Sequence, residues 1–181
     1  MVARLQERYK KEIAPALAKR FGHANPFAVP KLQKIVVSMG IGDAQQDQAK
    51  LETAQKQLAD IAGQKPIVTL AKKSVSNFKV RKGYKAGLKV TLRGPRMYEF
   101  LDRLVSVAIP RVKDFRGLNP AAFDGRGNFN MGLVEQTVFP EIDPASITSA
   151  QGMNISLATT AKTDEEAREL LSMLGVPFRQ D

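Results

Sequence analysis

Residues 88–93 read Leu-Lys-Val-Thr-Leu-Arg, and this stretch decides the fold. Its three apolar residues alternate with Lys89, Thr91 and Arg93, as in a β-strand that has one buried and one exposed face. Pro95 follows closely and suits the first turn of a helix. The stretch therefore predicts a strand that buries its apolar side chains, keeps a polar face open and leads directly into a helix.

On both sides of this strand the hydrophobic periodicity predicts further strands and helices. Strands are expected at 32–41, 67–70 and 153–157, and helices at 3–21, 43–62, 95–110 and 163–174. Asp43 is the expected cap of the second helix, and Thr163 with Glu166 forms a capping box before the last. Two segments lack periodicity: a basic loop over 72–86 and a Gly-, Pro- and Asn-rich insertion over 109–150.

This order of elements is typical of an α+β fold, a split βαβ sandwich like those of the RRM and ferredoxin-like proteins. Its sheet should be dominated by antiparallel pairs, with a hairpin joining the second and third strands. An N-terminal helix (1–26), the long basic hairpin loop (72–86) and the irregular insertion (109–150) are added to it. At 181 residues, the chain is expected to form a single domain over 1–181. Such a sandwich covers one sheet face with helices and leaves the other open.

The composition excludes several classes of function. The chain has 43% hydrophobic and 25% charged residues, which is ordinary for a globular protein. It has no cysteine and one histidine, so disulfides, zinc ribbons and thiol catalysis are excluded and no metal site or cofactor is expected. No apolar run is long enough to cross a bilayer and no secretory leader is visible, so we expect a cytoplasmic protein without a membrane partner.

The charge is strongly uneven along the chain. Residues 1–96 hold 20 Lys/Arg and 6 Asp/Glu, a net charge of +14, whereas residues 97–181 hold 8 and 12, a net charge of −4. Between Asp60 and Glu99 there are ten basic residues and no acidic one. Such a surface attracts polyanions, which favours nucleic acid as the partner over a merely solvated face. The acidic second half suits a basic protein.

The basic loop interleaves aromatic and cationic residues. Phe78 and Tyr84 alternate with lysines and arginines, and such cations neutralise phosphates while an aromatic ring can stack on an exposed base. Alternatively, Phe78 packs into the core and anchors the loop. The open strand face carries no such aromatic residues, so contacts there would be hydrogen bonds and ion pairs to sugar and phosphate. Recognition would then depend on the shape of a folded RNA.

A nucleotide-dependent enzyme is a second hypothesis. Residues 40–45 resemble a dinucleotide fingerprint between a strand and a helix, but the third glycine is replaced by Gln45 and Asp43 would face the pyrophosphate. A glycine-rich turn without a ligand explains the same residues better. Lys72, Lys73 and Ser74 lack the glycine framework of a phosphate loop. A general nucleic-acid-binding protein, without specificity for one folded RNA, is the third hypothesis.

Four segments carry a resemblance to a known family. They are KIVVSMGIG (34–42), LADIAGQKPIVTLAKKS (58–74), RVKDFRGL (111–118) and FDGRGNFNMGLVEQTVFPEI (123–142). These segments resemble the bacterial-type large-subunit (50S) ribosomal protein L-five family, which binds 5S rRNA. The resemblance is collinear over essentially the whole chain.

The resemblance implies a non-catalytic structural protein of the large ribosomal subunit, in the cytoplasm. It implies binding of 5S rRNA and its attachment to the central protuberance, contact with P-site tRNA through the basic loop, and a bridge to protein S-thirteen in the small-subunit head. Further implied partners are 23S rRNA and other proteins of the central protuberance.

The resemblance and the charge pattern together assign three groups of residues. The resemblance implies a 5S rRNA-binding face of Lys34, Ser38, Gln64 and Thr91, and the alternation over 88–93 adds Lys89 and Arg93. The tRNA-contacting loop is expected to comprise Lys72, Lys73, Ser74, Phe78, Lys79, Arg81, Lys82, Tyr84 and Lys85. The inter-subunit bridge is sought in the insertion, at Asp114, Arg116, Glu141 and Asp143. Ser38 stands where the family usually has asparagine, so its hydrogen bond to RNA is shorter, water-mediated or absent.

Overall fold

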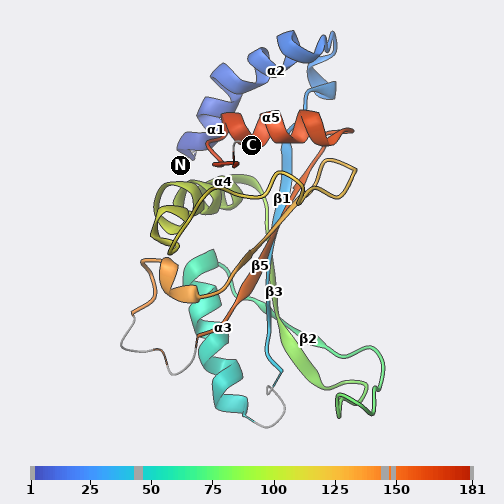
Figure 1. Ribbon diagram of the computed structural model, residues 1–181, viewed down its shortest axis with the longest axis vertical. Coiled ribbons are helices and arrows are strands. Elements are labelled where there is room, and N and C mark those ends of the chain that lie inside the picture. The colour runs from blue at the N-terminus through green and yellow to red at the C-terminus, as the bar shows by residue number, and fades with distance from the viewer. Residues whose placement is uncertain (1–2, 43–46, 144–146, 148–149, 180–181) are drawn as a thin grey trace.

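A five-stranded antiparallel sheet forms the centre of the computed structural model, which describes residues 3–42, 47–143, 147 and 150–179 (Figure 1). The strands lie side by side in the order β2-β3-β1-β5-β4. Their bounds are β1 Leu32–Gly40, β2 Ile67–Leu70, β3 Lys85–Leu92, β4 Phe129–Leu133 and β5 Met153–Thr159. Without β4, this is the strand order of a split βαβ sandwich, and the predicted α+β fold class is confirmed.

Helices cover one face of this sheet and the end of the molecule where β1 begins (Figure 1). The helices are α1 Arg4–Arg8, α2 Ala14–Phe21, α3 Gln48–Ala62, α4 Gly94–Arg103 and α5 Asp164–Met173. π-helical turns at Tyr9–Ile13 and Leu104–Ala108 continue α1 into α2 and extend α4, and short 3-10 turns occupy Pro26–Ala28, Ile109–Arg111 and Gln136–Val138.

The N-terminal helix follows its apolar stripe. Leu5, Ile13 and Leu17 are buried, and the hydroxyl of half-buried Tyr9 donates to the carbonyl of Pro30 at 2.9 Å. Apolar residues four apart drift by about 40° per step around a helix of 3.6 residues per turn. The π-helical turn inserts one wider turn, which brings the stripe back toward the core. Burial raises the pKa of Tyr9 to about 12.

The core lies between the sheet and helices α3, α4 and α5. Along β1, Ile35, Val37 and Met39 are buried and alternate with residues that are only half-buried. Phe100 of α4 is fully buried and stacks on Phe139, with ring centroids 6.0 Å apart. The period-two and period-3.6 patterns therefore identify the core correctly, and the opposite sheet face is left without a helical cover (Figure 1).

Three boundaries differ from the prediction. The insertion at 109–150 is not wholly irregular, because β4 pairs with β5 and adds a fifth strand at the sheet edge. Helix α3 begins at Gln48, and Asp47 caps it by accepting a hydrogen bond from the Lys50 backbone N–H at 2.9 Å. The expected cap, Asp43, lies outside the described residues. Finally, β3 begins at Lys85, so the basic loop is shorter than 72–86.

Candidate nucleic-acid interface

The open face of the sheet is lined by two rows of side chains that cross the strands. In one row, Ser38 of β1 lies opposite Lys89 of β3 and Asn154 of β5. In the next, Val36 lies opposite Thr91 and Ser156, again on β3 and β5, and β4 extends that row with Asn130. These residues alternate with the buried ones, which places them on the face opposite α3 and α4.

This face has no carboxylate among the strand residues that the structure describes. The side chains that point to it are basic, hydroxyl-bearing, amide or apolar: Lys34, Val36, Ser38, Ile67, Thr69, Lys89, Thr91, Asn130, Asn154, Ser156 and Ala158. Lys89 is exposed, and Lys34, Ser38 and Thr91 are half-buried. The face is therefore electrostatically suited to a polyanion and rich in groups that hydrogen-bond to it.

The two hydroxyls at the centre of this face remain available. Within the described part of the chain, neither Ser38 nor Thr91 uses its side-chain oxygen in a hydrogen bond. Gln64, in the turn after α3, donates from its amide nitrogen to the Thr91 carbonyl at 3.4 Å and accepts from Arg96 at 3.4 Å. Gln64 is thereby fixed beside Thr91. The structure thus brings Lys34, Ser38, Gln64, Lys89 and Thr91 together.

Arg93 lies at the end of the same strand rather than on its face. It is the exposed N-cap residue of α4, with an extended backbone. It therefore stands at the rim of the open face, where a long cationic side chain can reach a partner bound on the strands.

The basic loop between β2 and β3 is a hydrogen-bonded hairpin. Ala71 and Tyr84 are joined at its base by an N–H···O bond of 2.8 Å, and Val75 and Val80 exchange two bonds of 2.8 and 3.2 Å. A turn closes its tip, where the Lys79 N–H donates to the Ser76 carbonyl at 2.9 Å and Lys79 adopts a left-handed φ of 52°. The hairpin therefore holds its side chains in a defined arrangement.

Phe78 lies at the tip of this hairpin with 78% of its surface exposed, so it does not pack into the core. The cations of the hairpin, Lys72, Lys73, Lys79, Arg81 and Lys82, are all exposed. Within the described part of the chain none of them has an ion-pair partner. The tip thus combines a free aromatic ring with unpaired positive charge.

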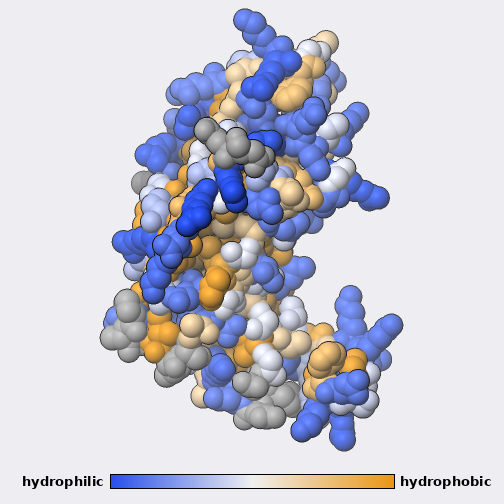
Figure 2. All heavy atoms as spheres, viewed as in Figure 1, coloured by the Kyte–Doolittle hydropathy of each residue, from blue (hydrophilic) through white to orange (hydrophobic). Residues whose placement is uncertain are grey.

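The remaining predicted loop residues support the hairpin. The Ser74 hydroxyl accepts a hydrogen bond from the Lys82 backbone N–H at 3.0 Å, and Tyr84 and Lys85 are half-buried at the base. Figures 1 and 2 show that the hairpin projects beyond the sheet on the side away from α3, with a hollow between it and the body of the protein. The open face forms one wall of that hollow.

The residues expected in the inter-subunit bridge are spread over two segments. Asp114 and Arg116 are exposed in the segment after the extended α4, and Asp143 is exposed after the Gln136–Val138 turn. Glu141 is half-buried in an ion pair with Arg103, which also donates to the Ile61 carbonyl at 2.9 Å. Glu141 therefore has a partner inside the protein.

Asn130, Asn154 and Ser156 line the open face but were not among the predicted site residues. Asn154 and Ser156 alternate with buried Met153 and Ile155, so the period-two pattern could have found them. Asn130 depends on β4, which was not predicted.

Family profiles cover most of the chain. The profile described as "Ribosomal protein L5" matches residues 25–81, and the one described as "ribosomal L5P family C-terminus" matches residues 85–178. The chain belongs to the ribosomal protein L5 family. The two matches meet in the hairpin, and together they include all five strands of the sheet.

Full-length relatives agree with this assignment. The protein "Large ribosomal subunit protein uL5" of Rubrobacter xylanophilus is 58% identical over 178 residues, which are 98% of this chain and 99% of the relative. Proteins of the same name from Alkaliphilus oremlandii and Thermus aquaticus are 56% and 57% identical over 177 and 176 residues. These matches cover 98% and 97% of this chain and 99% and 97% of the two relatives.

Membership in the L5 family settles the broad class of function. The chain is a non-catalytic protein of the large ribosomal subunit, located in the ribosome of the cytoplasm, and an RNA-binding component of a ribonucleoprotein. The hypothesis of a nucleotide-dependent enzyme is therefore wrong. Among the described residues, no helix is both long and apolar enough to cross a membrane.

Proposed function

We propose that this L5-family protein binds 5S ribosomal RNA on its open sheet face and attaches it to the central protuberance of the large subunit. The observation that carries the proposal is the acid-free row in which Lys89, Ser38 and Asn154 lie side by side across three strands. A-form RNA presents phosphates and 2′-hydroxyls along a wide, shallow minor groove. Lysine ammonium groups suit the phosphates, and hydroxyl and amide groups suit the 2′-hydroxyls.

The same face favours recognition of RNA shape over base stacking. An RRM presents aromatic rings on its sheet, whereas no described strand residue of this face is aromatic, and its exposed side chains include Lys89, Asn130 and Asn154, with the large apolar Ile67 at the β2 edge. Contacts would therefore run along sugar and phosphate. A general nucleic-acid-binding protein would use the same charges, but it would not distinguish folded RNA from duplex DNA.

We further propose that the hairpin between β2 and β3 contacts P-site tRNA. Its tip lies well away from the body of the protein, so it can reach a second RNA while the sheet holds the first (Figures 1 and 2). Exposed Phe78 can stack on a base or sugar, and the surrounding cations can contact phosphates. The two RNAs would then bind to separate surfaces of one protein.

The bridge to protein S-thirteen of the small-subunit head is proposed for the acidic second half of the chain. Exposed Asp114 and Asp143 suit a basic partner, and Arg116 lies beside them in sequence. Glu141 already has Arg103 as an ion-pair partner inside the protein. Contacts with 23S rRNA and with other proteins of the central protuberance belong to the same proposal.

Removing the two central hydroxyls tests the proposed 5S site. We expect the double variant Ser38→Ala, Thr91→Val to bind a 5S RNA transcript about tenfold more weakly, because each lost hydrogen bond costs roughly 0.5–1.5 kcal/mol. Its melting temperature should be unchanged, since neither hydroxyl has a partner within the described residues. Filter binding and thermal unfolding measure the two quantities.

Thr53→Val is the control for RNA affinity, because Thr53 is an exposed hydroxyl-bearing residue on α3, which covers the opposite face, and its hydroxyl donates to the Ala49 carbonyl within the helix at 2.9 Å. Its affinity for 5S RNA should equal that of the unchanged protein. If the double variant melts early, or binds 5S RNA as well as the control, the two hydroxyls do not form the RNA contact and the assignment fails.

A further inference from the structure

At the corner of the sheet diagonally opposite the basic hairpin, a hydrogen-bonded turn carries one exposed arginine. In the sequence Asp-Gly-Arg-Gly-Asn at 124–128, one carboxylate oxygen of Asp124 accepts hydrogen bonds from the backbone N–H groups of Arg126 and Asn128, at 2.9 and 3.0 Å. Its other oxygen accepts from the Asn128 side chain at 2.7 Å. Arg126 is at the tip of this turn, and its side chain is exposed.

The turn is tied to two other elements. Asp164, at the start of α5, accepts from the N–H groups of Gly125 and Gly127 at 3.1 and 2.8 Å. The Thr159 hydroxyl, at the end of β5, donates to the Gly127 carbonyl at 2.7 Å. The turn is therefore a fixed platform, and an arginine held on a fixed platform loses less freedom when it binds a ligand.

The two carboxylates near Arg126, those of Asp124 and Asp164, accept hydrogen bonds from the turn itself. Hydrogen bonds from the Asn128 side chain, and then from the backbone of Asn128 and Arg126, hold the pKa of Asp124 below its usual value. Its negative charge and that of Asp164 face the backbone of the turn. Within the described residues Arg126 has no hydrogen-bond or ion-pair partner for its guanidinium. It is an available cation in the half of the chain whose net charge is negative.

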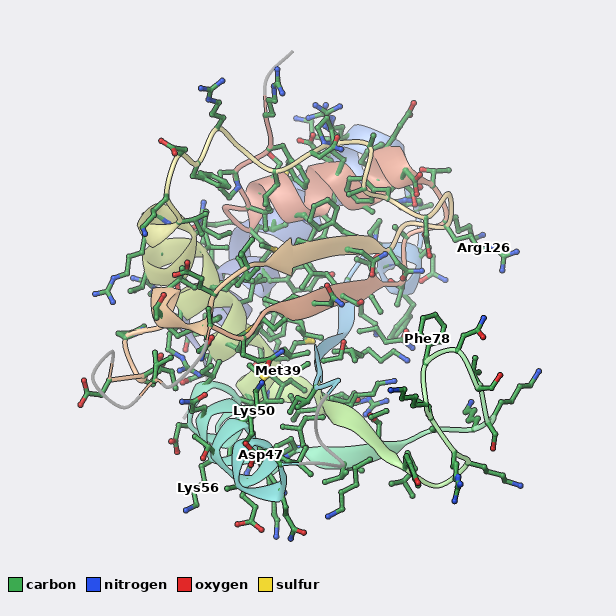
Figure 3. All side chains as sticks on the ribbon, turned by 60° about the horizontal axis from the view of Figure 1, so that its bottom comes forward. Met39, Asp47, Lys50, Lys56, Phe78 and Arg126 are labelled. Atoms are coloured by element: carbon green, nitrogen blue, oxygen red, sulfur yellow. The ribbon has the colours of Figure 1, made fainter. Side chains whose placement is uncertain are left out.

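The turn lies at one corner of the open face. It leads into β4, the strand at one edge of the sheet, and it lies near Thr159, which pairs with the beginning of β1. The basic hairpin joins β2 and β3 at the other edge and lies near Gly40, the end of β1. The two cationic elements therefore occupy diagonally opposite corners. Figure 3 shows Arg126 and Phe78 on the same side of the molecule, away from Lys50 and Lys56 of α3.

We propose that Arg126 is a phosphate-contacting residue for an RNA double helix that crosses the open face diagonally, between this turn and the base of the hairpin. Four strand spacings of about 4.8 Å make the sheet roughly 19 Å wide, so an RNA bound to its central strands can meet both edges. A guanidinium can bind a phosphate through two parallel N–H···O bonds. This inference rests on the proposed function, because it extends the 5S RNA site to a second corner of the sheet.

The test compares Arg126→Gln with Lys56→Gln in a salt titration of binding to a 5S RNA transcript. Both substitutions remove one exposed positive charge, but Lys56 is on α3, which covers the opposite face (Figure 3). We expect Arg126→Gln to weaken binding about three- to tenfold at physiological salt and to lower the slope of log K against log salt by about one. Lys56→Gln should change neither, and both variants should melt like the unchanged protein.

The outcomes separate this inference from the proposed function. If Arg126→Gln binds with the affinity and salt slope of Lys56→Gln, while Ser38→Ala, Thr91→Val still weakens binding, Arg126 is not a contact and the inference is overturned. If the unchanged protein does not prefer 5S RNA to duplex DNA, the proposed function itself fails. Arg126→Lys should recover the salt slope, because the charge returns, but not the full affinity, because an ammonium cannot form the bidentate contact.

Discussion

Lys89→Glu is expected to reduce the affinity for 5S RNA by roughly tenfold to a hundredfold, the largest effect of any single substitution on the open face. Lys89 is exposed at the middle of β3, with Ser38 and Ile67 as its cross-strand neighbours. The substitution changes the local charge by two and places the first carboxylate among the described strand residues of that face. Because like charges repel across a short distance, it should expel phosphate rather than only lose a contact.

Lys56→Glu is the matched control for this reversal. It makes the same change of charge at an exposed position of α3, on the covered side of the sheet, and should leave the affinity within about twofold. Both variants should unfold at nearly the temperature of the unchanged protein, since exposed substitutions usually alter stability by about 0.5 kcal/mol or less. Equal losses from the two reversals would mean that net charge, and not the open face, governs binding to 5S RNA.

Neutralising the hairpin tip is expected to separate the two RNA contacts. We predict that Lys79→Gln, Arg81→Gln and Lys82→Gln together weaken retention of P-site tRNA on ribosomes that carry the variant by about tenfold or more. The same triple variant should bind free 5S RNA within about twofold of normal. The reason is distance: Lys79 lies in the turn beyond the Val75–Val80 pair, and Arg81 and Lys82 follow that pair within the hairpin, whereas the sheet rows lie below the Ala71–Tyr84 base.

Two measurements on matched samples check the separation. Purified protein is titrated with 5S RNA, and ribosomes reconstituted with each variant are assayed for the dissociation rate of P-site tRNA. Lys89→Glu serves as the reciprocal variant, with 5S RNA binding lost and the hairpin unchanged. If the triple variant loses both activities in parallel, the hairpin and the sheet are one RNA surface, and the assignment of separate sites is wrong.

The sequence predicted the fold wherever periodicity was strong and local. The alternation at 88–92 and the four-residue stripe of the first helix depend on neighbouring residues, and both correspond to observed elements. Strand β4 was missed because Phe129, Met131 and Leu133 alternate with Asn130 and Gly132, which disfavour strands by propensity. Only pairing with β5 makes this segment a strand, and that pairing is a tertiary effect.

The candidate site was predictable to a similar extent. The cations of the hairpin, and Lys89 and Arg93, followed from charge and alternation, which can be read directly from the chain, whereas Lys34 followed from the family resemblance. The exposure of Phe78 did not, because a loop aromatic residue can either pack or project. The ion pair of Glu141 with Arg103, and the anchoring of the 124–128 turn by Asp164, join residues that are distant in sequence. Such contacts depend on the final packing of the chain.

The central claim is that the open face recognises a folded RNA by its shape. The most direct test is a salt titration of the unchanged protein with a 5S RNA transcript and a duplex DNA of the same length as competitor. We predict a clear preference for 5S RNA that survives physiological salt, where binding driven by phosphates alone falls to a Kd of roughly 10⁻⁴–10⁻⁶ M. Equal binding of the two nucleic acids, lost together as salt rises, would contradict the account and leave only a general nucleic-acid-binding surface.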